Sequence, residues 1–132
     1  MSNPLLSRTD QIQLLALARE SIQHGLDSGA PLKVNPDDFN AALSSPGAAF
    51  ITLEKQGDLR GCIGSVEAYR PLVEDVADHA WNAAFRDPRF PPLSPREFHQ
   101  IEIEISVLTQ PEDLSFDSEE DLKQQLVQVK TV

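Results

Sequence analysis

The segment 101–108, IEIEISVL, alternates between apolar and polar residues from Ile101 to Val107. Successive side chains of a β-strand point to opposite faces, so this spacing predicts a strand. We expect its apolar face to pack on the core and its polar face to meet water or a site. Glu102 and Glu104 lie on the polar face. One interpretation is a catalytic carboxylate pair, and the more common one is the solvated surface of an edge strand.

Two further strands are predicted on either side of a turn. The apolar, β-branched run AAFITLEK occupies 48–55 and the run LRGCIGSV occupies 59–66. Between them stands Gln56-Gly57-Asp58, a combination of residues that is typical of turns. The two runs therefore predict a β-hairpin with a loop of about 3–5 residues.

Capping residues and helical spacing predict helices around these strands. In the first helix, Ile12, Leu15, Arg19 and Ile22 are expected to lie on one stripe, with Leu14 and Ala18 beside it. The order of elements predicts an α+β fold, a mainly antiparallel sheet flanked by helices in a single compact domain over 1–132. The first predicted helix begins near Ser7 and ends at Gly25 or Gly29, the second covers 35–45 and the third covers 71–85. A single turn follows at 94–97, and a last helix opens at Ser118 with Leu122, Leu126 and Val129 on one face.

Three predicted strands make a thin sheet for a chain of 132 residues. We expect the sheet to be completed by residues missing from this chain, or by another chain in an oligomer or a complex.

Composition excludes several classes of function. The net charge of −10, with Lys and Arg scattered, repels phosphate backbones, so no nucleic-acid partner is expected. One cysteine excludes a disulfide within the chain and any multi-cysteine metal site, and it suits a reducing compartment. No apolar run reaches the ~20 residues of a transmembrane helix, and the N-terminus does not resemble a signal peptide. We expect a soluble, acidic, cytoplasmic protein without membrane contact, metal or cofactor.

The stretch LRGCIG at 59–64 holds the single cysteine, two glycines and an arginine. On a regular strand Arg60 and Cys62 share one face, where the positive charge of Arg60 would favour a reactive thiolate at Cys62. Gly61 and Gly64 indicate a bulge, a tight bend, or close approach by another backbone or a ligand. The residues alone favour a plainer interpretation, in which Cys62 packs as a small hydrophobe.

A reactive cysteine needs a base, and the sequence offers three imidazoles. His24 follows the first helix's apolar stripe, His79 lies on the flank of the 71–85 helix, and His99 precedes the 101–108 strand. None is placed by its spacing beside Cys62. The segment DPRF at 87–90 is a second candidate region, as a rigid helix exit or as a loop that brings Arg89 to the site.

The order of motifs resembles the AMMECR-type domain family, named after the Alport-syndrome chromosomal region. LRGCIG matches the signature of that family, preceded by AFITL and followed by AAFRDPRF and IEIEISVLTQPEDL. The resemblance covers roughly residues 5–116 and is strongest over 48–116. It implies an antiparallel sheet flanked by helices, with LRGCIG lining a surface cleft, rather than a defined reaction.

The resemblance also implies that family members continue well past the point at which this chain ends. It supports two hypotheses about function. In the first, the domain is an enzyme or binds a ligand, with Cys62 as the reactive thiol and Arg60, Gly61, Gly64 and Arg89 as binding residues. In the second, the domain is a non-catalytic interaction module, acting with a protein partner of the Memo-like or radical-SAM class.

Overall fold

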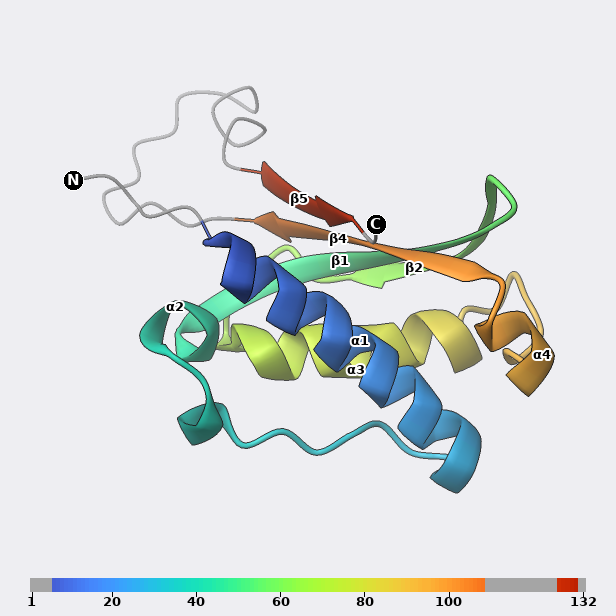
Figure 1. Cartoon of the computed structure of the whole chain (residues 1–132), viewed down its shortest axis with the longest axis horizontal. Coiled ribbons are helices and arrows are strands. Elements are labelled where there is room, and N and C mark those ends of the chain that lie inside the picture. Colours follow the sequence, from blue (N-terminus) through green and yellow to red (C-terminus); the bar gives the residue numbers. More distant parts are fainter. Residues whose placement is uncertain (1–5, 109–125, 131–132) are drawn as a thin grey trace.

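The structure is a computed structural model that describes residues 6–108 and 126–130. Its described part has two layers, with α1 and α3 lying against one face of a β-sheet (Figure 1). The predicted α+β fold, a mainly antiparallel sheet with helices, is confirmed. The helices are α1 Arg8–Ser28, η1 Pro36–Asp38, α2 Ala41–Ser44, α3 Leu72–Phe85 and α4 Pro95–Phe98, and the strands are β1 Pro46–Lys55, β2 Asp58–Gly64, β3 Arg70–Pro71, β4 Ile101–Leu108 and β5 Leu126–Lys130.

The sheet runs in the order β2-β1-β4-β5, and the short β3 pairs with the start of β1. All pairings are antiparallel. β1 and β4 pair along their length, from Ala48 opposite Leu108 to Lys55 opposite Ile101. The three strands predicted from the sequence are therefore neighbours in the sheet, with β1 between β2 and β4.

The core lies between the sheet and the helices. The isoleucines at 101, 103 and 105 of β4 are buried, as the alternation predicts, and so are Ile51 and Leu53 of β1. Alanines at 80, 83 and 84 on α3 allow this helix to lie close to the sheet. On α1, Ile22 is buried as predicted, whereas Ile12 is 55% exposed. The buried stripe instead includes Leu14 and Ala18, which the prediction placed beside it.

The helix predicted to open at Ser118 is wrong over the part that the structure describes. Leu126 and Val129 belong to β5, which pairs with β4 in antiparallel register. The sequence LVQVK is rich in β-branched residues, and the open edge of β4 offers it a ladder of hydrogen bonds. Residues 118–125 lie outside the described residues. With β5 and the short β3, the described part of the chain supplies two more strands than the sequence predicts.

Local details also differ from the prediction. The β1–β2 loop has two residues rather than about three to five, and both have positive φ, 55° at Gln56 and 87° at Gly57. This geometry is a type I′ turn, which matches the twist of the paired strands. The helix predicted over 35–45 is interrupted at Phe39, because Asn40 caps α2 anew by accepting the Leu43 N–H.

Candidate functional site

A β-bulge divides the LRGCIG stretch. In the pairing of β1 with β2, Leu53 lies opposite Gly61 and Glu54 lies opposite Leu59, so Arg60 is the extra residue. A bulge changes the face to which the following residues point. The prediction that Arg60 and Cys62 share one face is therefore wrong: the Arg60 side chain reaches α4, whereas the Cys62 thiol lies beside Thr52 on the face away from α3. A bulge was one of the three explanations that the glycines left open.

Arg60 is buried, and its charge is balanced within the protein. Its Nε and Nη2 donate to the Glu97 carboxylate at 3.1 and 3.0 Å, and Nη2 also donates to Pro91 O at 2.7 Å. These hydrogen bonds from Arg60 are the main reason that the pKa of Glu97 falls to about 2, against the opposing effect of burial. Lys55 Nζ adds a contact at 3.2 Å. The ion pair between Arg60 and Glu97 therefore connects β2 to α4.

The two glycines of the stretch stand where side chains would collide with neighbours. A Cβ on Gly61 would meet the Ala83 carbonyl oxygen of α3, and a Cβ on Gly64 would meet the Phe50 ring of β1. At Gly61 the sheet and α3 approach each other backbone to backbone, another of the explanations left open by the sequence. Packing accounts for both glycines.

The predicted loop segment 87–90 lies against the edge of β2. The Cys62 N–H points away from β1 and donates to Asp87 Oδ2 at 3.1 Å. Asp87 Oδ1 accepts from the Arg89 N–H and Nε, both at 3.0 Å, and Oδ2 accepts from Nη2 at 2.7 Å. LRGCIG and DPRF, which are separated by 22 residues in the sequence, thus form one structural unit.

The charges of this unit are asymmetrically exposed. The Asp87 side chain is 2% exposed, whereas the Arg89 side chain is 55% exposed. Hydrogen bonds from Arg89 hold the pKa of Asp87 far below its usual range. The pKa of Arg89 is raised, chiefly by its hydrogen bond to Asp87. Arg89 and Cys62 share one acceptor, because Asp87 Oδ2 accepts from Arg89 Nη2 and from the Cys62 N–H. Solvent therefore meets a guanidinium beside a cysteine.

Cys62 is free and half-buried, with its sulfur 3.4 Å from Thr52 Oγ1. Within residues 6–108 and 126–130 no imidazole is hydrogen-bonded to this thiol. His24 Nδ1 lies 2.8 Å from Ala30 O, His79 is bonded elsewhere, and the His99 ring packs on Phe98. Glu104 shares the outer face of the sheet, because Thr52 stands opposite both Cys62 and Glu104.

The structure also contains a buried polar network that the sequence analysis missed. Ser65 Oγ lies 2.6 Å from His79 Nε2, and Asp75 Oδ1 lies 3.3 Å from the same nitrogen. His79 Nδ1 is buried without a partner in the described part of the chain. In a serine–histidine–aspartate triad the serine and the aspartate contact different ring nitrogens, so this arrangement is not one.

Asp75 is the centre of that network and is fully buried. Its carboxylate accepts from the Ala49 N–H and from Arg70 Nε, both at 2.9 Å. Burial opposes ionisation, but the hydrogen bonds from His79, Arg70 and Ala49 outweigh it and lower the pKa of Asp75. The network joins α3 to β1 and β3. The signal in the sequence was the i,i+4 spacing of Asp75 and His79 on one predicted helix.

No group of three or more His, Cys, Asp or Glu side chains among the described residues is arranged to hold a metal ion. No helix among the same residues is long and apolar enough to cross a membrane.

Comparison with known proteins places this chain in a family. The model of the AMMECR1 family matches residues 15–131. The chain belongs to the AMMECR1 family. Two AMMECR1-like relatives are a protein of Methanothermobacter thermautotrophicus, 42% identical over 116 residues, and a protein of Sulfolobus acidocaldarius, 47% identical over 108 residues. They match 88% and 78% of this AMMECR1 chain, and the matches span 60% and 46% of the relatives.

The AMMECR1 fold is also found in a solved structure. The crystal structure of protein PH0010 from Pyrococcus horikoshii superposes with a TM-score of 0.67 at 36% sequence identity. The match covers 82% of this chain and 55% of that protein. This AMMECR1 chain thus spans about half to three-fifths of the length of these relatives.

Proposed function

We propose that this AMMECR1-family chain is a ligand-binding domain, and that Arg89 holds an anionic small molecule beside Cys62. The observation that carries the proposal is the exposed Arg89 guanidinium, which a buried carboxylate fixes at the edge of the LRGCIG strand. Both carboxylate oxygens of Asp87 already accept hydrogen bonds, Oδ1 from Arg89 Nε and Oδ2 from the Cys62 N–H. The charged group that remains available to a ligand is therefore the Arg89 guanidinium.

The geometry favours binding over catalysis. Arg89 is oriented through Nε and Nη2, so its position is set before a ligand arrives, which lowers the entropy cost of binding. Cys62 has Thr52 as its hydrogen-bond partner and, among the residues that the structure describes, no base. The thiol would line the site rather than attack the ligand. The single cysteine also suits a reducing compartment such as the cytoplasm, which we propose as the location.

Alkylation of the single cysteine tests this proposal directly. Iodoacetate and iodoacetamide are similar in size, but only iodoacetate is an anion. We expect Arg89→Gln to lower the ratio of the iodoacetate rate to the iodoacetamide rate at Cys62 roughly tenfold, because a local positive charge attracts only the anionic reagent. A change in the thiolate fraction of Cys62 would alter both rates equally and leave the ratio unchanged. The difference should shrink as ionic strength rises.

Two further variants separate the local charge from other effects. Arg86→Gln removes a nearby exposed arginine that does not contact Asp87 and should leave the ratio of the two rates as in the wild type. The double variant Asp87→Asn/Arg89→Gln keeps the net charge and should still lose the preference for iodoacetate. An unchanged rate ratio in Arg89→Gln would refute the anion site.

A second candidate function is the non-catalytic interaction module. The observation in its favour is the loop after β2, where Val66 is 68% exposed and Tyr69 is 66% exposed. A protein partner, of the Memo-like or radical-SAM class that the family resemblance suggests, would cover these side chains. Capture of such a partner that Val66→Ser/Tyr69→Ser abolishes and Arg89→Gln preserves would favour this function over ligand binding.

A further inference from the structure

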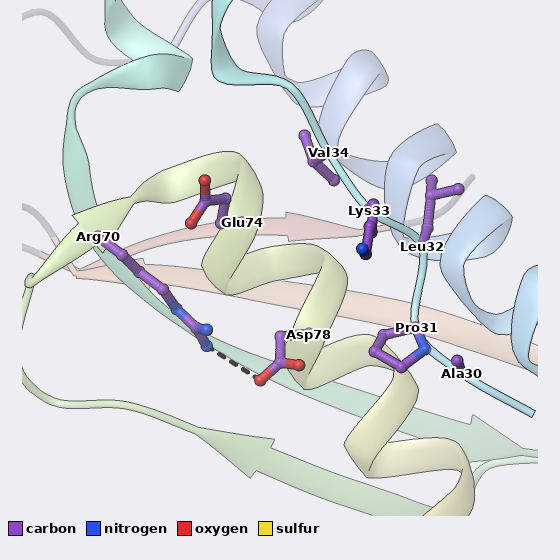
Figure 2. A pocket seen from close by; sticks show the side chains of 8 residues that line it. All are labelled: Ala30, Pro31, Leu32, Lys33, Val34, Arg70, Glu74 and Asp78. Atoms are coloured by element: carbon purple, nitrogen blue, oxygen red, sulfur yellow. Dashed lines mark hydrogen bonds and ion pairs between the residues drawn. The ribbon is translucent and has the colours of Figure 1, made fainter.

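A pocket of about 410 Å³ lies at the opposite end of α3 from Cys62 and Arg89. One wall is the extended segment 30–34 that follows α1, and the other is the first half of α3 together with Arg70 of β3 (Figure 2). Its volume falls within the roughly 300–1,000 Å³ that is usual for small-molecule sites. Asp78 is the lining residue furthest along α3 and stands before its last two turns, which end at Phe85, so the two sites are separated by about 10 Å or more along the helix.

The walls of this pocket are held in place by hydrogen bonds. The Leu32 N–H donates to Ser21 Oγ at 3.3 Å, and Ser21 Oγ donates to Ala77 O at 2.7 Å, so segment 30–34 is tied to α1 and to α3. Leu32 and Val34 also pack against the core. The pocket therefore exists before any ligand binds, which favours affinity.

On the α3 side, Arg70 is fixed at two points. Its Nε donates to Asp75 at 2.9 Å, and its Nη2 donates to Asp78 at 3.2 Å, the contact drawn in Figure 2. The Arg70 side chain is 22% exposed and that of Asp78 is 37% exposed, so both ions reach solvent at the rim of the pocket.

Two further charges stand on opposite walls of the pocket. Lys33 comes from segment 30–34 and Glu74 from α3. Among the described residues neither forms an ion pair, although charges of opposite sign line the same cavity. Lys33 and Arg70 carry two positive charges, and Glu74 and Asp78 carry two negative ones, so the lining has no net charge. A ligand with one charge would thus satisfy one wall and meet an unmatched charge on the other.

We propose that this pocket binds a small zwitterion of the amino-acid class. The carboxylate of the ligand would contact Lys33, and its ammonium group would contact Glu74. The side chain of the ligand would pack on Pro31 and its neighbours in segment 30–34, which supply the apolar part of the wall. The site is independent of the proposed anion site at Arg89.

The test begins with titration of the protein by each proteinogenic amino acid, followed through backbone amide chemical shifts. We expect at least one amino acid to shift the amides of Lys33 and Glu74. The amide derivative of that amino acid, which lacks the carboxylate, and its N-acetyl derivative, which lacks the ammonium group, should each bind roughly tenfold more weakly.

Charge-removing variants then assign each contact. Lys33→Gln should erase the advantage of the amino acid over its amide, and Glu74→Gln should erase its advantage over the N-acetyl derivative. Arg8→Gln, which removes an exposed charge at the start of α1, serves as the control and should change neither ratio. The alkylation rates of Cys62 should stay the same throughout, which keeps this test separate from that of the anion site.

Three results would overturn the proposal. The first is that no amino acid shifts the amides that line the pocket. The second is that the amide and N-acetyl derivatives bind as well as the parent amino acid. The third is that Lys33→Gln and Glu74→Gln change the ratios no more than Arg8→Gln does.

Discussion

Gly61 is the residue of the LRGCIG stretch whose identity the packing restricts most directly. It sits where β2 meets α3, and the atom that a side chain would strike is a backbone oxygen, Ala83 O. A backbone atom of a helix has less room to move than the end of a side chain. The absence of a Cβ at this position therefore sets how closely the helix and the sheet can approach.

We predict that Gly61→Ala lowers the free energy of unfolding by about 1–3 kcal/mol, because α3 has to move to admit the methyl group. Denaturant titration followed by Trp81 fluorescence measures this. Gly57→Asn is the control, since the space around Gly57 is open and asparagine tolerates its positive φ. A Gly61→Ala protein as stable as the wild type would contradict the packing role.

At the scale of single residues, the sequence predicted the position of the candidate site better than its internal contacts. LRGCIG and DPRF were both singled out, and the structure brings them together through Asp87. The side on which Arg60 lies was predicted incorrectly, because a bulge depends on how β2 pairs with β1. The carboxylate that neutralises Arg60, Glu97, comes from 37 residues further along the chain.

The turn of the β1–β2 hairpin restricts the backbone conformation of two residues. This two-residue turn requires positive φ at both positions, and glycine meets that requirement at position 57. Gln56, with φ at 55°, is less suited, because a left-handed conformation is unfavourable for most residues with a Cβ. Asn-Gly is the preferred pair for a type I′ turn.

We expect Gln56→Asn to stabilise the protein by about 0.5 kcal/mol, since asparagine adopts the left-handed region more readily than glutamine. A shift in the midpoint of urea unfolding, at an unchanged slope, would measure the gain. Gln56→Val should do the opposite, because a β-branched residue is an outlier at positive φ. Equal midpoints for the asparagine and valine variants would show that the turn does not constrain this position.

Elements with local signals were predicted well. The capping boxes at Ser7 and Ser94 are both present, and the start and end of α3 fall within a residue of the predicted 71–85. β5 was missed because the i, i+4, i+7 spacing of Leu122, Leu126 and Val129 also fits a helix. Pairing with β4, a tertiary interaction, decides between the two structures for residues 126–130.

Across the whole molecule, buried or partly buried carboxylates join elements that are distant in sequence. Asp10 accepts from Asn40 at 2.8 Å and so links α1 to the start of α2. Asp75 links α3 to β1, Asp87 links the loop after α3 to β2, and Glu97 links α4 to β2. All four have pKa values lowered by their hydrogen bonds. The fold is therefore expected to be sensitive to acid.

Glu97 gives this expectation a defined pH window. Its pKa falls from 4.5 to about 2 in the folded protein, so its contribution to stability is complete above pH 4.5 and is lost as the pH falls towards 2. We predict that Glu97→Gln lowers stability at pH 7 and reduces the loss between pH 4.5 and 2 by about 2–3 kcal/mol.

Urea unfolding at several pH values from 7 to 2 measures that difference. Glu102→Gln is the matched control, because Glu102 is exposed on the outer face of the sheet and should leave the acid dependence unchanged. If Glu97→Gln loses stability as steeply as the wild type over this range, the ion pair with Arg60 does not contribute as proposed.

The α+β class was predictable at this scale because it follows from alternation and helical spacing, which are local patterns. The polar network around Asp75 was not, because its partners Ala49, Ser65 and Arg70 come from separate elements. The same holds for the pocket beside segment 30–34, whose two walls come from segments that only the fold brings together.

The Asp87 carboxylate also has a consequence for how this protein behaves among other copies of itself. β2 is an edge strand, and the unpaired N–H groups of an edge invite another chain to add a strand. The Cys62 N–H, in the middle of that edge, is already bonded to Asp87, and the loop that carries Asp87 lies alongside. A strand approaching from outside would have to displace a buried, charged acceptor, so this edge is protected against aggregation by strand addition.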